Sequence, residues 1–279
     1  MNDVSAQTAT DAGQRASGSS FYAAMRIMPR EQREAMFEIY SFCRAVDDIA
    51  DEAGDRDKRL GELQRWREDI NALYAGTAPP QLRGLAKAVR TFNLQREDFH
   101  AIIDGMEMDV TSTIVAPDFP TLDLYCDRVA SAVGRLSVRV FGMEQEAGLA
   151  LAYHLGRALQ LTNILRDLDE DAGIGRLYLP REALREADIA TDDPAQALAS
   201  PAITKVCRQI AELAARHFEE ADAIMAKAPR RAVKTPRIMA AAYRPMLARM
   251  VRQGWQAPRE RVSVSRAQFL WILLRYAIV

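Results

Sequence analysis

The feature of this sequence that most constrains its fold is a helical repeat of apolar residues that continues through almost the whole chain. Apolar side chains recur at intervals of three and four residues, and no segment shows the alternating pattern of a strand with one exposed face. Proline and glycine gather between the periodic segments, where one helix ends and the next begins. The pattern therefore predicts an all-α protein. Helices are expected near residues 30–53, 57–75, 81–92, 95–112, 121–142, 145–171, 202–227, 235–253 and 264–276.

No linker or internal repeat divides the chain into domains. Its 279 residues are 49% apolar, which is enough for one large core. The first residues are small and polar, without the apolar stretch of a signal peptide. We expect a disordered leader over residues 1–16 and one helical domain over residues 17–279.

Charge and cysteine content argue against several classes of protein. The formal net charge is −1, from 37 basic and 38 acidic residues, so the basic excess with which proteins bind nucleic acid is missing. The three cysteines are odd in number and far apart, which argues against a disulfide framework or a structural zinc site and favours a cytoplasmic protein. The three histidines have no metal-binding spacing, which argues against a zinc hydrolase.

The most apolar stretch of the sequence lies in residues 267–279. Arg275 interrupts it, and it is shorter than the roughly 20 residues that a membrane-spanning helix requires. We expect this stretch either to pack in the core or to rest on a membrane surface, so that peripheral membrane contact stays open.

The first of two acidic motifs is a D-D-x-x-D sequence that comprises Asp47, Asp48 and Asp51. A helical wheel of residues 36–51 places Asp47 in the middle of an apolar face, Asp51 one turn later and Asp48 at the flank. A carboxylate directed into a core is unfavourable unless a cation neutralises it, and Mg²⁺ typically binds one or two carboxylates together with substrate phosphates. A solvated acidic face and an ion pair with Arg44 are the simpler alternatives. The apolar face comprises Met36, Ile39, Tyr40, Cys43, Val46 and Ala50.

Asn163, Asp167 and Asp171 form the second acidic motif, in which each member follows the previous one at i+4. A wheel of residues 154–171 places them on one polar face, and any amphipathic surface helix has the same pattern. Two such rows of oxygen ligands on facing helices would line a cavity that holds metal ions bridging a diphosphate. The polar face also contains Gly156 and Gln160, and the opposite face contains Leu161, Ile164, Leu165 and Leu168.

Two arginines accompany the second motif. Arg166 lies within it, and Arg176 follows it in a loop marked by Gly175 and Pro180. The planar guanidinium donates two parallel hydrogen bonds, a geometry that suits phosphate oxygens. Taken singly, each of these arginines is more simply explained as a surface charge.

Together the two motifs resemble those of the squalene and phytoene synthases, the head-to-head prenyl transferases of the trans-isoprenoid synthase fold. The resemblance covers roughly residues 17–275 and implies a single-domain helical bundle around a central cavity. Residues 19–27 and 46–52 look most like the presqualene diphosphate synthases of bacterial hopanoid pathways. The segments that carry the resemblance are Ser20–Tyr22, Ile39–Glu52, Gln160–Asp171 and Arg176–Pro180.

The resemblance also implies roles for individual residues. Metal ligands would be Asp47, Asp51, Asn163, Asp167 and Asp171. Catalytic groups would be Asp47, Asp48, Asp51, Tyr40 and Tyr178. Substrate and diphosphate would contact Ser20, Phe21, Arg44, Gln160, Arg166, Arg176, Tyr243 and Arg261. The prenyl tunnel would be lined by Tyr125, Val129, Ala130 and Gly134.

The chemistry implied by the resemblance is the condensation of two farnesyl diphosphates to presqualene diphosphate, towards squalene and hopanoids. Mg²⁺, with Mn²⁺ as an alternative, and arginines would withdraw charge from one diphosphate until its allylic C–O bond ionises. The double bond of the second substrate then attacks, and loss of a proton closes a cyclopropane. A tyrosine or the released diphosphate would accept that proton. No NADPH is expected, and squalene-forming enzymes would act downstream.

Three alternatives stay open at this point. Phytoene synthase joins two geranylgeranyl diphosphates by the same chemistry, and only the length of the tunnel separates the two activities. A non-catalytic helical assembly factor with this fold is a second alternative, although intact acidic motifs argue against it. A peripheral membrane-binding helical module, based on residues 269–274, is the third.

Overall fold

A computed structural model of the chain describes residues 25–52, 54–111, 114–191 and 193–277, and within these ranges every regular element is a helix. The predicted all-α, single-domain fold is confirmed, whereas the predicted leader over residues 1–16 lies outside the described residues. The helices are α3 (Arg30–Asp51), α4 (Arg56–Tyr74), η2 (Pro80–Leu82), α5 (Arg83–Phe92), α6 (Arg96–Thr111), α7 (Phe119–Cys126), the π-helical turn η3 (Asp127–Ser131), α8 (Ala132–Val140), α9 (Gln145–Arg166), α10 (Leu168–Gly173), α11 (Arg181–Glu186), α12 (Pro194–Ala199), α13 (Ile203–Lys227), α14 (Lys234–Gln253) and α15 (Arg266–Ala277).

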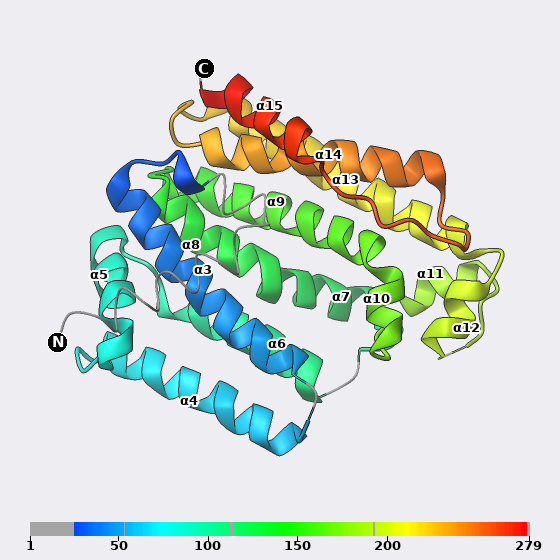
Figure 1. The fold of residues 1–279 in the computed structure, drawn as a ribbon, viewed down its shortest axis with the longest axis horizontal. Coiled ribbons are helices and arrows are strands. Elements are labelled where there is room, and N and C mark those ends of the chain that lie inside the picture. The colour runs from blue at the N-terminus through cyan, green and yellow to red at the C-terminus, as the bar shows by residue number, and fades with distance from the viewer. Residues whose placement is uncertain (1–24, 53, 112–113, 192, 278–279) are drawn as a thin grey trace.

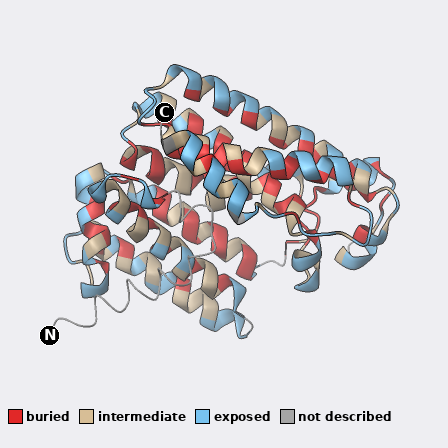
Figure 2. Cartoon of the chain, turned by 45° about the horizontal axis from the view of Figure 1, so that its top comes forward, coloured by how far each residue is buried: buried red, intermediate tan, exposed pale blue. Residues whose placement is uncertain are grey.

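The long helices lie side by side, with α3, α4 and α6 on one side of the molecule and α13, α14 and α15 on the other (Figure 1). Helix α9 runs through the middle and contacts α8, α13 and α14. Two large apolar clusters result, one around α3 to α6 and α8, the other around α7 and α9 to α14. Buried residues follow the helix faces that turn toward the interior (Figure 2). Apolar stripes of amphipathic helices thus build the core on both sides of α9.

Aspartates begin several of these helices because a carboxylate can accept a hydrogen bond from the free backbone N–H groups of a first turn. Asp118 accepts from the N–H of Thr121 at 2.9 Å, and Asp193 accepts from the N–H of Gln196 at 3.0 Å. A proline stands within the first two positions of both helices, where it gives up no helical hydrogen bond. These caps fix where α7 and α12 begin.

The observed helices differ from the predicted ones in four places. The helix predicted over 121–142 contains the π-helical turn η3, and the helix predicted over 145–171 breaks at Asp167, which has φ −103° and ψ 16°. Helices α11 and α12 were not predicted, because six residues are too few for a periodic pattern to emerge.

Glycines allow helices to approach closely around η3. A Cβ atom on Gly156 would lie 2.7 Å from the Cα of Ser131, and one on Gly105 would lie 2.7 Å from a methyl group of Val129. The backbone of Ser131 thus occupies the place that a side chain at position 156 would need, and Gly156 also lines a cavity next to α9. Gly156 therefore serves the packing of η3 on α9.

In the described ranges, no helix combines the length and apolar character that crossing a membrane requires.

Candidate functional site

A cavity of about 390 Å³ lies between α3, α8, α9 and α14. Its walls on α9 extend from Leu151 to Asn163, which at 1.5 Å per residue corresponds to roughly 18 Å. Asp47 and Asn163 stand at the same end of this cavity, and apolar residues such as Leu155 and Met239 line much of the remainder. The cavity thus combines a polar end with a long apolar chamber, a form that suits a molecule with a charged head and a hydrocarbon tail.

One part of the apolar face of α3 packs in the core, and another part lines this cavity. Met36 and Val46 are buried in the core, whereas Tyr40 and Asp47 line the cavity. The wheel therefore placed Asp47 on the correct face, but its side chain is partly buried at the cavity, with 40% exposed, and does not enter the core as expected.

Carboxylates from three separate helices influence one another electrostatically. Burial, and then the charge of Asp51, raise the pKa of Asp47 to about 6. Burial, and then the charge of Asp167, raise the pKa of Asp171 to about 7. Asp109 on α6 contributes to both shifts. Negative charge is thus concentrated where the two motifs meet, an environment that favours a divalent cation.

The arginines that sequence reasoning assigned to diphosphate pair with these carboxylates. Arg44 pairs with Asp47 at 2.8 Å and also with Asp48. Arg176 joins the loop after α10 to Asp51 at 3.1 Å. Each pair contains one group suited to a metal ion and one suited to phosphate, so a metal diphosphate offers both of them a stronger partner.

Asp167 has two arginine partners at the break between α9 and α10. The Arg166 Nε atom donates to it at 2.8 Å, and the Arg261 Nη2 atom donates at 2.9 Å. Burial alone would raise its pKa, but the hydrogen bonds and charges of these arginines lower the pKa below the usual value. Asp167 therefore stays ionised next to two guanidinium groups.

Asp109 is a site residue that sequence reasoning missed. Its carboxylate is 9% exposed and accepts hydrogen bonds from the hydroxyl of Tyr178 at 2.7 Å and from that of Tyr125 at 3.0 Å. The two rings stack, with centroids 4.8 Å apart. Burial raises the pKa of Asp109 despite the nearby Arg176. A helical wheel of residues 95–112 places Asp109 on the same side as Phe99 and Met106. An acidic residue on an apolar helix face was the sequence signal that could have identified Asp109.

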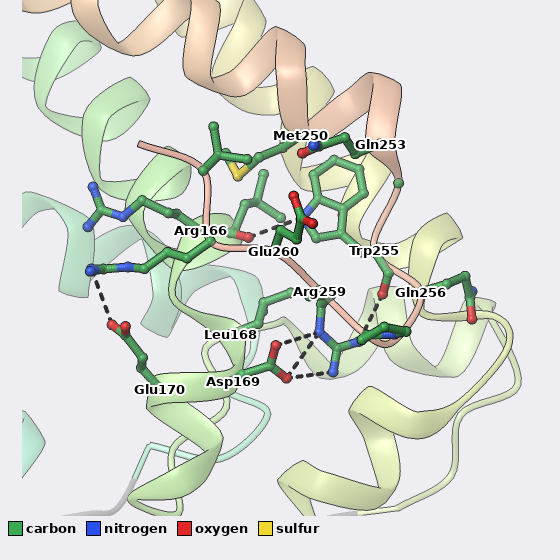
Figure 3. Close-up of a pocket in the computed structure, with 15 residues that line it drawn as sticks. Arg166, Leu168, Asp169, Glu170, Met250, Gln253, Trp255, Gln256, Arg259 and Glu260 are labelled. Carbon is green, nitrogen blue, oxygen red and sulfur yellow. Dashed lines mark hydrogen bonds and ion pairs between the residues drawn. The ribbon is translucent and has the colours of Figure 1, made fainter. Parts of the chain in front are cut away.

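A strap formed by residues 254–262 crosses the outside of the second motif and encloses a cleft of about 410 Å³ (Figure 3). The Trp255 indole N–H donates to the carbonyl of Leu165 at 3.1 Å, on the α9 side of the break. The guanidinium of Arg259 donates hydrogen bonds to both carboxylate oxygens of Asp169 on the α10 side, and the shortest of them is 2.7 Å. The strap therefore holds both sides of the helix break at Asp167.

The donor set at the polar end fits Mg²⁺. The side-chain oxygen of Asn163, which lines the cavity, is buried without a hydrogen-bond partner. Within the described ranges no group of three or more histidine, cysteine or acidic side chains is already arranged around a metal position. Mg²⁺ commonly completes its shell with substrate phosphates and water, so one or two protein carboxylates per ion suffice.

The structure brings eight of the predicted site residues into the wall of one cavity, and others lie outside it. Tyr125 does not line the cavity as expected, because it is stacked on Tyr178 behind the wall. Ser20 and Phe21 lie outside the described residues. Arg166 and Arg261 line the cleft under the strap. The cavity residues are Tyr40, Asp47, Val129, Ala130, Gly134, Gln160, Asn163 and Tyr243.

Comparison with known sequences gives a consistent picture. A family model described as squalene/phytoene synthase matches residues 14–268. A presqualene diphosphate synthase of Rhodopseudomonas palustris is 60% identical over 262 residues, with 94% of each chain covered. The corresponding protein of Sinorhizobium fredii is 57% identical over the same length and coverage. A phytoene synthase of Mycobacterium tuberculosis is 36% identical over 199 residues, which cover 68% of this chain and 65% of the relative.

Solved structures with a similar fold agree with this picture. A squalene synthase from Alicyclobacillus acidocaldarius superposes with a TM-score of 0.79 at 28% identity, covering 90% of this chain and 94% of the other. A dehydrosqualene synthase in complex with a ligand superposes with a TM-score of 0.83 at 24% identity, covering 98% and 96%. The second likeness supports the fold alone.

Proposed function

We propose a reaction for this chain from the premise that it belongs to the squalene/phytoene synthase family: it condenses two farnesyl diphosphates head to head into presqualene diphosphate and releases diphosphate. The identity of 60% over 94% of the chain to a presqualene diphosphate synthase, against 36% over 68% to a phytoene synthase, supports this substrate over geranylgeranyl diphosphate. The enzyme is therefore a prenyl transferase.

The observation that carries the proposal is the cavity with one acidic end. An apolar chamber along α8, α9 and α14 accommodates prenyl chains, and Asp47 and Asn163 stand where the charged heads would lie. A chamber lined by apolar groups also keeps water away from an allylic cation, which water would otherwise capture. Head and tail are thus recognised by opposite ends of one cavity.

We further propose that Asp47, Asp51, Asn163, Asp167 and Asp171 hold Mg²⁺, with Mn²⁺ as a substitute. When bound, the metal withdraws electron density from the diphosphate and makes it a better leaving group. Arg44, Arg166, Arg176 and Arg261 turn from their carboxylates to the diphosphate oxygens, which orients the allylic C–O bond. No NADPH takes part in this reaction.

The tyrosines at the site act as hydrogen-bond donors. Burial raises the pKa of Tyr40, Tyr125 and Tyr178, so all three hydroxyls keep their protons at neutral pH. A protonated phenol is a poor base, whereas the released diphosphate carries several basic oxygens. The diphosphate is therefore the better acceptor for the proton that leaves when the cyclopropane closes.

The test is incubation of the purified protein with farnesyl diphosphate and Mg²⁺, without NADPH, followed by mass spectrometry of intact diphosphates. Presqualene diphosphate that forms only with the metal is the expected product. Phytoene from geranylgeranyl diphosphate, with no product from farnesyl diphosphate, would establish the alternative substrate. Inactivity with both substrates would favour a non-catalytic assembly factor.

We also propose that the enzyme works on the cytoplasmic side of a membrane and passes its product to squalene-forming enzymes. Substrates and product are amphiphilic lipids, so the transfer from enzyme to enzyme is shortest along a bilayer surface.

A further inference from the structure

The C-terminal helix α15 is apolar on two faces. Phe269, Ile272 and Leu273 turn inward and pack with α14, and Ile272 is 3% exposed. A second set of residues with the same helical spacing points away from α14, and we term it the outer stripe: Ala267, Leu270, Trp271 and Leu274. A helix with apolar residues on both faces is normally covered on both sides.

The large side chains of the outer stripe face water in the isolated chain. Leu270, Trp271 and Leu274 are 57%, 60% and 54% exposed. Scattered exposed leucines are ordinary on a protein surface, but three large neighbours on one helix face form a continuous patch. Arg275 lies over the rings of Trp271 and Tyr276, at 5.5 Å and 5.9 Å from their centroids. Aromatic rings combined with arginine are typical of the boundary between lipid and water.

A basic segment lies beside the same end of α15. Residues 227–237 connect α13 to α14 and contain five lysines and arginines and no acidic residue, in a chain whose net charge is −1. Lys227, Arg230 and Arg231 are exposed. A cleft lined by Met225, Arg237, Arg275 and Tyr276 places the segment next to the last turn of α15. The acidic residue of that cleft, Asp222, is paired with Arg244 at 2.6 Å.

A second copy of the chain would not cover this surface well. In a two-fold symmetric contact each copy would present the same apolar and basic patch, so residues 227–237 would offer no carboxylate to the cations of the other copy. Stable dimers also bury about 1,200–2,000 Å² in total, more than a stripe of four side chains provides. An anionic surface satisfies both the apolar stripe and the cations.

Helix α14 lies between α15 and the cavity. Thr235, Pro236 and Met239 line the cavity from one side of α14. Ile238 and Ala242 pack against α15 from the other side. Helix α15 lies along α14 at the edge of the molecule (Figure 1), so α14 is in contact with the cavity on one side and with α15 on the other.

We propose that the outer stripe of α15 and the basic segment 227–237 together dock the protein on a bilayer that contains anionic lipid. Leu270, Trp271 and Leu274 insert among the acyl chains near the headgroups, while Lys227, Arg230 and Arg231 contact lipid phosphates. The helix lies in the plane of the membrane and does not cross it. This inference concerns vesicle binding and is tested without substrate, so it stands or falls separately from the proposed reaction.

The experiment is co-sedimentation of the full-length protein with vesicles of phosphatidylcholine, alone or mixed with phosphatidylglycerol, at low and high salt. We expect binding to the mixed vesicles that weakens with salt, since the cations act through screened electrostatics. The triple variant Leu270→Gln, Trp271→Gln, Leu274→Gln should bind at least about tenfold more weakly, because it loses the three apolar groups that insert into the bilayer. The pair Arg230→Glu, Arg231→Glu should bind more weakly at low salt only.

Two matched controls separate this surface from general effects. The triple variant Leu124→Gln, Leu149→Gln, Val251→Gln removes as many exposed apolar groups from α7, α9 and α14, and the pair Arg208→Glu, Arg216→Glu makes the same change of charge on α13. Both controls should bind vesicles like the wild type, and thermal unfolding checks that all variants fold. Trp271 fluorescence should shift to the blue on binding, and a Trp271→Phe variant should lose that shift.

Several results would overturn the proposal. Wild-type protein that stays in the supernatant with every vesicle excludes membrane docking. If the triple variant of the outer stripe still binds vesicles like the wild type, another surface of the protein makes the membrane contact. If the wild type is a dimer in analytical ultracentrifugation and the triple variant of the outer stripe is a monomer, a second copy of the chain covers the stripe instead.

Discussion

At the scale of single residues, the carboxylates within each acidic motif repel one another. Asp171 has its pKa raised to about 7 by burial and then by Asp167, and Asp47 has its pKa raised to about 6 by burial and then by Asp51. An acid whose pKa is higher in the folded state binds more protons there than in the unfolded chain. Its ionisation therefore opposes folding, increasingly so as the pH rises from the unfolded to the folded pKa.

We predict that Asp171→Asn stabilises the protein against heat, and that the gain grows from about pH 4 to pH 7 and is constant above. Near neutral pH a gain of about 2–4 °C corresponds to roughly 1 kcal/mol in a domain of this size. Thermal unfolding across this pH range, in buffers without divalent cations, measures it. Asp69→Asn is the control, because Asp69 lies on α4, outside both acidic motifs. A gain that shrinks as the pH rises would contradict the account.

The Asp109 carboxylate and its two tyrosines form the second group at this scale. We predict that Asp109→Ala lowers the free energy of unfolding by about 2–4 kcal/mol, because it leaves two buried hydroxyls without their acceptor. Asp109→Asn keeps the shape and should lose about 1 kcal/mol, but it removes a negative charge between the motifs and should lower kcat/KM. Urea unfolding and steady-state kinetics separate the two effects. An Asp109→Ala variant as stable as the wild type would contradict the hydrogen-bond network.

At the scale of elements, the break between α9 and α10 places the second motif. The residue spacing in this motif predicted one continuous helix, and neither propensity nor periodicity marks Asp167 as its end. The contacts that hold the break come from the strap, some 90 residues later in the chain, through Trp255 and Arg259. Local patterns predict the candidate ligands, but they do not reveal a break that depends on such distant contacts.

We predict that Arg259→Lys raises the Mg²⁺ concentration needed for half-maximal activity by about tenfold, because a lysine cannot form the bidentate hydrogen bonds to the two oxygens of Asp169. The KM for farnesyl diphosphate at saturating metal should change less. Binding of Mn²⁺ with pyrophosphate, followed by electron paramagnetic resonance, should weaken in parallel. Arg244→Lys is a matched control, since Arg244 also bridges a carboxylate, Asp222, and a carbonyl, that of Phe218. If Arg259→Lys and Arg244→Lys had equal effects, the strap would not be responsible for positioning the second motif.

Close helix contacts at η3 give a further prediction at this scale. Gly156→Ala should destabilise the protein by about 1–3 kcal/mol, because its Cβ would collide with the backbone of Ser131. Gly61→Ala on α4 meets nothing within 4 Å and should stabilise by about 0.5–1 kcal/mol through helix propensity. Denaturant unfolding of both variants measures the difference. Two substitutions with the same sign would contradict the packing described for η3.

At the scale of the whole molecule, the cavity lies between two cores that meet along α9. The all-α class and the longer helices follow from apolar periodicity, which is a local property of the sequence. The shape of the cavity follows from how α3, α8, α9 and α14 pack together, and this explains why Tyr125 was placed in its wall while Asp109 was overlooked. Patterns within a helix predict which face is polar, but not which neighbour covers that face.

The charge arrangement of the whole site leads to the central claim, that acidic groups from α3 and from the α9–α10 junction act together on one diphosphate. Asp47 and Asp167 belong to helices far apart in the sequence, and each is paired with at least one arginine. If both hold the same metal diphosphate, loss of either carboxylate removes an essential part of one unit, and the effects of the two losses are not additive.

The most direct test is the rate of presqualene diphosphate formation from farnesyl diphosphate and Mg²⁺ by the wild type, by Asp47→Asn, by Asp167→Asn and by the double variant. The account predicts a loss on the order of a thousandfold in each single variant, little further loss in the double variant, and unchanged helical content by circular dichroism. Wild-type rates in either single variant, or losses that multiply in the double variant, would contradict it.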